Sequence, residues 1–445
     1  WNADLGTNVG YQGIEWRNLA LRLPLKSVNV SVVKNSANKP VTDNNPNYSL
    51  EGAMYSVSTA SNMSSPVGTI TTDKYGNGST GTMELDSSIT TLYAQETKPS
   101  KGYCLDPQVY TVTLDSNGKG SFTSTEPVGN DPLTITLNKV SENGDVIPAG
   151  EEPKSLEGAE FTVKYYAVDT TTVNSSDDLV NVTPTKTWVL KTVKSADGKY
   201  TVRLDDAHKV SGDSFYTETL VSGNKRTYLP LGVMTVEETK APEGYTLENK
   251  ITIQDTCDQV TTAANGVALF KIGGSNGTYQ VQGGNYFTAA EKPVYGALNI
   301  TKKDSQLGAE AQGDAPNLSA TFEVVNDTED TKTMIAPDGN RYTAAPHAAF
   351  EYKIHTDDAG NFQSPAEFLE YGEYTVSEIE APEGYEGTSV TRKVAIKNEG
   401  DSISIEYAND IKRGTFSVQK LNAETGSRAN GATDLQISFD VYNRS

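Results

Sequence analysis

The chain has 445 residues, more than one hydrophobic core usually supports, and this length predicts about three domains. Acidic residues outnumber basic residues by 58 to 37, and the resulting net charge of −21 disfavours nucleic acid and anionic lipid as partners. Abundant Thr, Val and Tyr in alternating patterns favour an all-β fold. No apolar run approaches the length of a membrane span.

Cysteine and histidine are too sparse to predict a metal or redox site. Cys104 and Cys257 are far apart in the sequence, so we expect two unpaired thiols. His208, His347 and His355 lack the spacing of zinc ligands, and nothing supports a Ser–His triad. We therefore expect neither a metal nor a cofactor.

The first 27 residues match none of the repeated features that follow. No signal peptide opens the chain at Trp1. We expect residues 1–27 to be the tail of an unassigned upstream region, in a fragment whose targeting signals lie outside it.

Four later segments share an alternating apolar pattern that ends in a lysine. Because side chains of a strand alternate between its two faces, each lysine shares the face of the apolar residues before it. An unpaired charge is costly in an apolar core, so each lysine would need a partner there. The segments are VSVVK (30–34), ITLNK (135–139), LNITK (298–302) and FSVQK (416–420), which end in Lys34, Lys139, Lys302 and Lys420.

Two further features follow three of these lysines. One is a segment close to L-x-G-A-x-F-x-V: LEGAMYSV (50–57), LEGAEFTV (156–163) and LSATFEVV (318–325). The other places a glutamate six residues before a Gly-Tyr pair: YAQETKPSKGY (93–103), TVEETKAPEGY (235–245) and TVSEIEAPEGY (375–385). The glutamates are Glu96, Glu238 and Glu378, about 140 residues apart, so the repeat is one of whole domains.

The repeat divides the chain into modules with short linkers, which predicts an elongated rod of β-sandwiches. A fourth lysine strand without a glutamate motif predicts a module that begins but is not completed. After residues 1–27, the predicted units are module 1 (28–132), module 2 with large insertions (133–293), module 3 (294–412) and the start of module 4 (413–445).

Module 3 offers the fullest set of reactive residues. Asn409 alternates with Ile403, Ile405 and Tyr407 on the last strand, and therefore faces the same core as Lys302 and Glu378. Burial lowers the pKa of a lysine and raises that of a glutamate, which favours a neutral amine beside a protonated acid. Such an amine could attack the Asn side chain with loss of ammonia, while the glutamate moves protons. The reaction would occur once per domain, without turnover.

These modules resemble the Cna B-type, prealbumin-like domains of Gram-positive surface adhesins and pilins. The E-x-x-A-P-x-G-Y motif, the I-x-K strand, the L-x-G-A-x-F-x-V segment and the terminal-strand Asn carry the resemblance over about residues 28–445. It implies tandem Ig-like or prealbumin-like β-sandwiches. It also implies an isopeptide bond between Lys302 and Asn409, with Glu378 as the catalytic residue.

The same roles are assigned less completely in the other modules. In module 1, Lys34 and Glu96 match, and Asn130 is the predicted acceptor, with Asp131 as a fallback. In module 2, Lys139 and Glu238 match, but the acceptor position falls on Glu291. A Lys139–Glu291 ion pair, or no link, is an alternative to a bond there, and Asn285 is a second candidate acceptor. Lys420 would find its partners outside the fragment.

Other patterns have simpler interpretations. A-P-x-G-Y is also a turn signature, and strand lysines are more often solvated than reactive. Recurrence with matched alternation favours the reactive interpretation in modules 1 and 3, and leaves module 2 undecided. The G-x-G-x-x-G match at 76–81 and the G-x-S-x-G match at 273–277 are predicted to be turns, because neither leads into a helix.

The favoured function is the structural stalk of an extracellular, cell-wall-anchored adhesin or pilus-associated protein. It would reach peptidoglycan through a sorting signal outside the fragment. The second hypothesis is a binding protein that recognises host matrix or glycan through the insertions of module 2 (164–235 and 254–285), where Trp188 could contact a ligand or be buried. The third is a pilus backbone subunit, which by resemblance needs a linking-Lys motif and a sorting signal, and neither is visible. A turnover enzyme is disfavoured.

Overall fold

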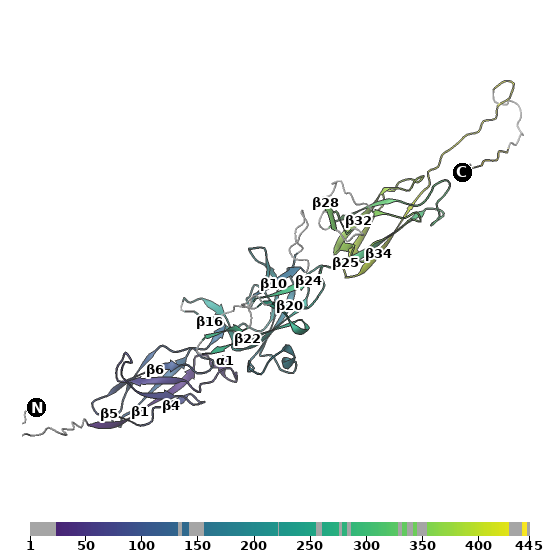
Figure 1. The fold of residues 1–445 in the computed structure, drawn as a ribbon. Helices are drawn as coiled ribbons and strands as arrows, with labels where there is room; N and C mark the ends of the chain where they lie inside the picture. The colour runs from purple at the N-terminus through teal and green to yellow at the C-terminus, as the bar shows by residue number, and fades with distance from the viewer. Residues whose placement is uncertain are drawn as a thin grey trace, which may run out of the picture.

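The computed structural model describes most of the chain, and the structural statements below concern that part. The described residues are 24–131, 136–141, 155–220, 222–254, 260–275, 278–282, 286–327, 332–335, 341–344, 354–426 and 438–442. Their regular structure is almost entirely β, arranged as three successive two-sheet sandwiches (Figure 1). The prediction of tandem β-sandwiches is confirmed.

Module 1 consists of two four-stranded sheets around one apolar core. Inward-facing Val30, Val32, Tyr55 and Leu92 are fully buried, as the alternating pattern requires. One sheet contains β1 (Leu25–Ser36), β4 (Asn77–Ser79), β5 (Met83–Asp86) and β8 (Lys119–Glu126). The other contains β2 (Met54–Ser58), β3 (Pro66–Thr71), β6 (Thr91–Lys98) and β7 (Val109–Thr113). A short helix, α1 (Lys39–Thr42), follows β1.

Module 2 has the same plan with wider sheets, each of six strands among the described residues. The first is ordered β13 (Val193–Lys194), β14 (Tyr200–Val202), β10 (Thr136–Ser141), β24 (Tyr286–Glu291), β20 (Lys250–Gln254), β21 (Val260–Thr262). The second is ordered β15 (Lys209–Gly212), β12 (Lys186–Lys191), β11 (Glu160–Tyr166), β19 (Gly232–Lys240), β22 (Val267–Ser275), β23 (Thr278–Gln282). The insertions add the hairpin β16 (Thr217–Thr219) and β17 (Lys225–Thr227), with 3₁₀ turns at Ser176–Leu179 and Ala264–Gly266.

In its described residues, module 3 has four strands in each sheet. The first sheet contains β25 (Tyr295–Asp304), β30 (Asn361–Gln363), β31 (Leu369–Glu370) and β34 (Asp401–Asn409). The second is ordered β29 (Ile354–His355), β26 (Thr321–Asn326), β32 (Gly372–Glu380), β33 (Thr391–Ile396). A separate hairpin joins β27 (Lys332–Ile335) to β28 (Arg341–Ala344).

The first and last strands of every module are hydrogen-bonded neighbours that run parallel. These pairs are β1 with β8, β10 with β24, and β25 with β34. The chain therefore enters a module at one end of this pair and leaves it at the other end.

Modules 1 and 2 share a continuous apolar joint. Tyr48 and Tyr103 of module 1 belong to the same buried cluster as Leu231 of module 2. The Tyr48 hydroxyl accepts a hydrogen bond from the Leu231 backbone N–H (2.9 Å) and donates to the Gly129 carbonyl (2.8 Å). A two-residue strand, β9 (Asn130–Asp131), pairs across the joint with β18 (Leu229–Pro230). This joint resembles an interior more than a flexible linker.

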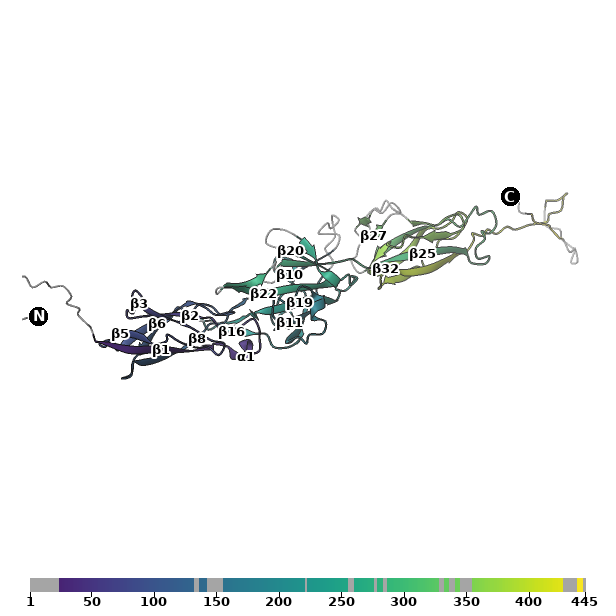
Figure 2. The ribbon, with the colours of Figure 1, turned by 60° about the horizontal axis from the view of Figure 1, so that its bottom comes forward.

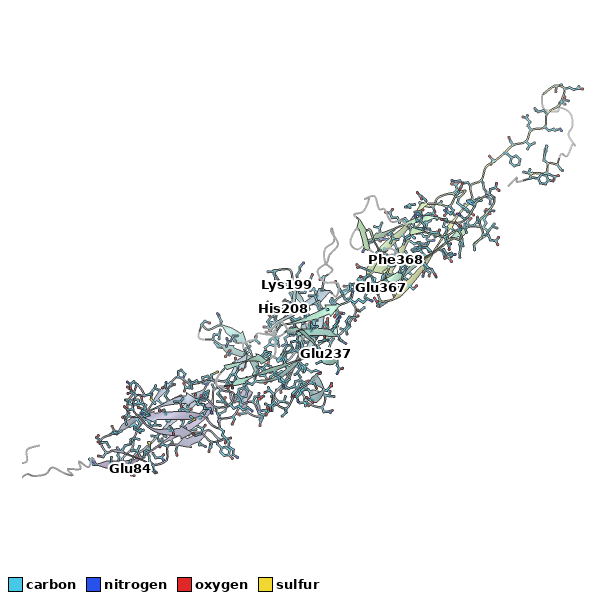
Figure 3. All side chains as sticks on the ribbon, viewed as in Figure 1. Glu84, Lys199, His208, Glu237, Glu367 and Phe368 are labelled. Carbon is cyan, nitrogen blue, oxygen red and sulfur yellow. The ribbon has the colours of Figure 1, made fainter. Side chains whose placement is uncertain are left out.

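The joint between modules 2 and 3 contains ion pairs and a hydrogen bond between charged or polar side chains. Lys292 Nζ lies 2.8 Å from Glu367 Oε1 and 3.1 Å from Glu399 Oε1. The Tyr371 hydroxyl donates to the Glu243 carboxylate. Figure 3 labels Glu367 at the end of module 3 that faces module 2. The modules lie end to end in an elongated molecule, with β1 of module 1 towards one end and β25 of module 3 towards the other (Figures 1 and 2).

The predicted start of module 4 lies in residues 413–445, of which the structure describes 413–426 and 438–442. Residues 413–426 and 438–442 contain no strand, and Phe416, Val418 and Lys420 are exposed. The expected FSVQK strand has no neighbouring strand here, and an isolated strand gains no ladder of hydrogen bonds. No described helix is long and apolar enough to cross a membrane.

Candidate functional site

Each module core contains one buried lysine on its first strand. Lys34, Lys139 and Lys302 are exposed by 3% or less. In all three, the preceding apolar residues of β1, β10 and β25 occupy the same inner face, so the backbone aims the amine between the two sheets. The partner lies on the facing sheet: Glu96 on β6, Glu238 on β19 and Glu378 on β32, all buried or nearly so.

The parallel register defines a third residue at the same place in every module. Lys34 is paired with Ser124, Lys139 with Ala289, and Lys302 with Tyr407. Two residues further along the last strand, the inward-facing residue is Glu126, Glu291 and Asn409, respectively. All three are buried, with exposures of 0%, 0% and 3%.

This register corrects the expected acceptor of module 1. Asn130 does not meet Lys34; it lies on β9, opposite Pro230, and Asp131 lies opposite Leu229. The segment from Glu126 to Lys139 is two residues longer than the segment from Glu291 to Lys302, because it includes β9. The prediction placed the acceptor of module 1 nine residues before Lys139, at Asn130, whereas the last strand ends 13 residues before Lys139, at Glu126.

In module 3 the lysine and the asparagine meet at the same glutamate. Lys302 Nζ lies 3.4 Å from Glu378 Oε1. Asn409 Nδ2 donates to Glu378 Oε2 (2.8 Å) and Oε1 (3.1 Å), and the Thr388 backbone N–H donates to Oε2 (3.2 Å). Among the described residues, Lys302 Nζ and Asn409 Oδ1 have no hydrogen-bond partner. An amine and an amide therefore lie beside one carboxyl, each with unused hydrogen-bonding capacity.

In module 1 the lysine lies between two carboxylates. Lys34 Nζ is 2.8 Å from both Glu96 Oε1 and Glu126 Oε2. Glu96 Oε2 accepts a hydrogen bond from the Asp106 backbone N–H (2.8 Å). Glu126 Oε1 accepts hydrogen bonds from the hydroxyls of Tyr55 (2.8 Å) and Ser124.

Module 2 repeats this arrangement with less hydrogen bonding. Lys139 Nζ is 2.7 Å from Glu238 Oε2 and also contacts Glu291 Oε1. Among the described residues, Glu238 Oε1 and Glu291 Oε2 have no hydrogen-bond partner. The expected Lys139–Glu291 contact is present as an ion pair, whereas Asn285 lies outside the described residues.

An aromatic residue and a β-bulge accompany the glutamate in all three modules. Tyr55 is opposite Glu96, Phe161 opposite Glu238, and Phe322 opposite Glu378. The strand register shifts immediately before each aromatic residue, and such bulges redirect side chains near sites. This aromatic position is the F of the L-x-G-A-x-F-x-V segment, so the sequence carried the signal although its role at the site was missed.

Burial perturbs the ionisable groups in the directions that favour neutral forms. Desolvation raises the pKa of Glu96 to about 7 and that of Glu238 to about 8, and the neighbouring carboxylate adds to each shift. Desolvation also lowers the pKa of Lys302, against the opposing attraction of Glu378. A lysine with a lowered pKa is more often the neutral, nucleophilic amine.

The Gly-Tyr pairs of the glutamate motif fix where the chain leaves each module. The carbonyls of Gly102, Gly244 and Gly384 accept hydrogen bonds from the backbone N–H groups of Gly129, Val294 and Lys412, respectively. The following tyrosines form β-bridges to Val128, Pro293 and Ile411. The motif therefore connects the buried glutamate to the segment by which the chain leaves the module, which is a role beyond that of a turn.

The remaining candidate residues lie away from these sites. Trp188 is fully buried and stacks on Phe215, with ring centroids 5.7 Å apart, so it does not present a ligand-binding ring at the surface. Cys104 is a free, half-buried thiol, and Cys257 lies outside the described residues. The described residues contain no group of His, Cys, Asp or Glu suited to a metal ion.

A model of one protein family matches parts of two of the modules. The model of the SpaA prealbumin-like fold domain matches residues 37–127 and 296–411, which lie in modules 1 and 3. The resemblance inferred from the sequence is thereby confirmed. No curated protein sequence matches the chain.

Solved structures of Gram-positive proteins are also similar. The Bacillus anthracis TIE protein covers 86% of this chain at 19% identity, with a TM-score of 0.48, and the chain spans about half of it (51%). BcpA, the major pilin subunit of Bacillus cereus, covers 87% at 14% identity over its whole length (100%), with a TM-score of 0.30. The pilus adhesin SpaC of Lactobacillus rhamnosus GG covers 88% at 13% identity over 44% of its length, with a TM-score of 0.31.

Proposed function

We propose that this chain, which carries SpaA-type prealbumin-like fold domains at residues 37–127 and 296–411, forms part of the stalk of a Gram-positive pilus or surface protein. In this proposal the stalk is extracellular and attached to the cell wall, and its modules keep a binding region away from the cell. The three sandwiches joined end to end support it, because short joints transmit position and force along the molecule.

The observation that carries the proposal is the Lys302–Glu378–Asn409 set in the core of module 3. The neutral Lys302 amine attacks Asn409 Cγ, and a new C–N bond forms between the two side chains. Glu378 accepts the proton from the attacking amine and delivers it to the departing amide nitrogen, which leaves as ammonia. The product is one amide bond, and Glu378 returns to its starting protonation state.

The position of this bond suits a molecule under tension. Lys302 and Asn409 lie near the C-terminal ends of two parallel strands, β25 and β34. A force that enters through β25 would cross the bond and leave after Asn409. Residues 303–408 would then carry none of the load, and the module could not be extended by unfolding.

Modules 1 and 2 have a different chemistry at the same position. Glu126 and Glu291 have no ammonia to lose, and each contacts a lysine that also contacts a second carboxyl group, that of Glu96 or Glu238. We therefore assign these two sets as buried ion pairs, and one isopeptide bond to the described modules. A buried ion pair costs desolvation energy. It also disfavours any packing that separates the two charges, because either charge alone would be strongly unfavourable in the core.

The intact mass of the purified chain tests this function. We expect a deficit of one ammonia from the sequence mass, lost in both Glu378→Ala and Asn409→Ala. Glu406→Ala is the matched control, because this glutamate is also on β34 but is exposed and pairs with Lys303 at the surface. A wild-type mass equal to the sequence mass would refute the bond, and a deficit of more than one would refute the assignment of modules 1 and 2.

A further inference from the structure

A glycine turn touches the backbone of the buried lysine in modules 1 and 3. The Lys34 N–H donates to the Gly76 carbonyl (2.8 Å), and the Lys302 N–H donates to the Gly360 carbonyl (2.7 Å). A Cβ added at Gly76 would lie 2.4 Å from the Lys34 carbonyl oxygen. A Cβ added at Gly360 would lie 2.4 Å from that of Lys302. Real Cβ atoms essentially never approach a backbone atom this closely.

The two turns are built alike from the sequences Asp73-Lys-Tyr-Gly-Asn77 and Asp357-Asp-Ala-Gly-Asn361. In each, the aspartate N–H donates to the asparagine carbonyl (2.8 Å), and the glycine N–H donates to the aspartate carbonyl (2.9 Å). The aspartate Oδ1 also accepts the asparagine N–H, at 2.9 Å in module 1 and 2.7 Å in module 3. Both glycines have positive φ angles, 79° and 84°. The turn is therefore a compact unit that places its glycine against the lysine.

Module 2 lacks this contact. Its corresponding hairpin has Gly198 at the turn, where an added Cβ would meet nothing within 4 Å. In modules 1 and 3, the asparagine of the turn is opposite the residue that precedes the lysine: Asn77 is opposite Val33, and Asn361 is opposite Thr301. In module 2, the residue before the lysine is Asn138, and it is opposite Thr201. Tyr200 thus stands where modules 1 and 3 have glycine, and the turn begins two residues farther from the lysine.

We propose that Gly360 is a positioning residue for isopeptide formation in module 3. Because Gly360 has no side chain, β25 can lie close to the turn, and this position of β25 determines how far the Lys302 amine lies from Glu378 and Asn409. This inference rests on the proposed bond. A side chain at Gly360 would push β30 and β25 apart by a substantial fraction of an ångström. Misplacements on the order of 1 Å can slow a reaction about a hundredfold. Gly76 would place Lys34 in the same way between its two carboxylates.

The test follows ammonia loss over time in the full chain made by cell-free synthesis, with samples quenched in denaturant and weighed intact. We expect Gly360→Ala to slow bond formation by about tenfold or more. Gly400→Ala should react at the wild-type rate. Gly400 is a matched control: its φ is also positive (78°) and it directly precedes β34, which is in the same sheet as β25 and β30, but an added Cβ meets nothing within 4 Å.

To separate an effect on stability from an effect on positioning, Gly360→Ala and Gly400→Ala are each combined with Lys302→Ala, so that no bond can form. Equal protease resistance of module 3 in the two double variants, together with a slower reaction in Gly360→Ala alone, would establish positioning. If Gly360→Ala does not fold, Asp357→Ala takes its place, because it loosens the turn without adding an atom beside Lys302. Its control is Asp401→Ala, whose carboxylate caps the Gly400 turn through the N–H groups of Lys397 and Asn398.

The outcomes are distinct. A wild-type chain that loses ammonia and a Gly360→Ala (or Asp357→Ala) chain that loses it equally fast would overturn the positioning role alone. A wild-type chain that never loses ammonia would overturn the bond itself, and with it the reaction that the glycine is proposed to assist.

Discussion

Glu126 of module 1 occupies the position on the last strand that Asn409 occupies in module 3. Each lies two residues beyond the partner of the buried lysine, on a strand parallel to the lysine strand. The two side chains differ in their terminal group. The amide of Asn409 can release ammonia, whereas the carboxylate of Glu126 beside a lysine forms an ion pair. The three modules therefore offer one scaffold with two kinds of residue set at the same place in the core.

The first prediction is that the acceptor residue alone decides whether a bond forms. In module 2, Glu291→Asn recreates the module 3 set, since Phe161 already stands where module 3 has Phe322. We expect the intact mass to show one further ammonia lost. Glu291→Gln is the control, because it also supplies an amide but on a side chain that is one methylene longer than that of Asn. No additional loss in Glu291→Asn would show that Lys139 cannot reach this position as a nucleophile.

The second prediction concerns stability. Asn409→Ala should leave module 3 folded but easier to unfold and to digest, because it removes the proposed closure of a loop of about 100 residues. A disulfide closing such a loop contributes roughly 4–5 kcal/mol in a model-dependent estimate. Calorimetry and limited proteolysis measure the change. Glu406→Ala, on the exposed face of the same strand, should have little effect; equal stability of both variants would contradict the staple.

The alternation of residues was enough to predict part of this site. Period-two patterns indicated that Lys34, Lys139 and Lys302 face the core, and the structure buries all three. The Gly-Tyr motif indicated which glutamate stands opposite each lysine. Both signals are local, because a strand has only two faces and the choice between them is set by neighbouring residues.

The third member of the set could not be read in the same way for module 1. It depends on the register between two parallel strands separated by 92 residues at Lys34 and Glu126, and on a joint that contains β9. No local pattern encodes such a register. The absence of a strand at FSVQK among the described residues has a similar cause: an alternating sequence forms a strand only beside neighbouring strands.

The third prediction is a pH dependence of module 2. Burial raises the pKa of Glu238 to about 8, from an ordinary value of 4.5. A carboxyl whose pKa is raised by folding contributes stability that is full below pH 4.5 and is lost as the pH rises through about 8. We expect module 2 to lose on the order of a few kcal/mol between pH 5 and pH 9.

Glu238→Gln is the control for this prediction, because it keeps the shape of the side chain and removes the titration. The difference in melting temperature between wild type and Glu238→Gln should change steadily with pH. A constant difference across this range would mean that Glu238 does not titrate there. Module 1 should show a smaller effect, since the pKa of Glu96 rises only to about 7.

The fourth prediction is that modules 1 and 2 unfold together. Asn45 and Asn47 are buried at their joint, where Asn45 Nδ2 donates to the Leu231 carbonyl (2.9 Å) and Asn47 Nδ2 donates to the Val168 carbonyl (2.6 Å). An unsatisfied buried group costs about 1–3 kcal/mol. Asn47→Ala should therefore weaken the joint and split one calorimetric transition into two.

A control for the joint lies at the other junction. Lys292→Ala removes only partly exposed contacts to Glu367 and Glu399, which contribute little in water. It should leave the transition of modules 1 and 2 unchanged. Separate transitions for modules 1 and 2 in the wild-type chain would show that the shared apolar cluster does not couple their folding.

The last prediction combines the acceptor with the glycine turn. Glu126→Asn with Tyr55→Phe converts module 1 to the module 3 set without leaving the Tyr55 hydroxyl unpaired in the core. Module 1 has its glycine, Gly76, against the lysine backbone, whereas module 2 has Tyr200 at this place. If the turn positions the amine, ammonia loss should be faster in the converted module 1 than in Glu291→Asn. Adding Gly76→Ala should abolish that advantage, while Gly52→Ala, with a similar positive φ and open space around it, should preserve it.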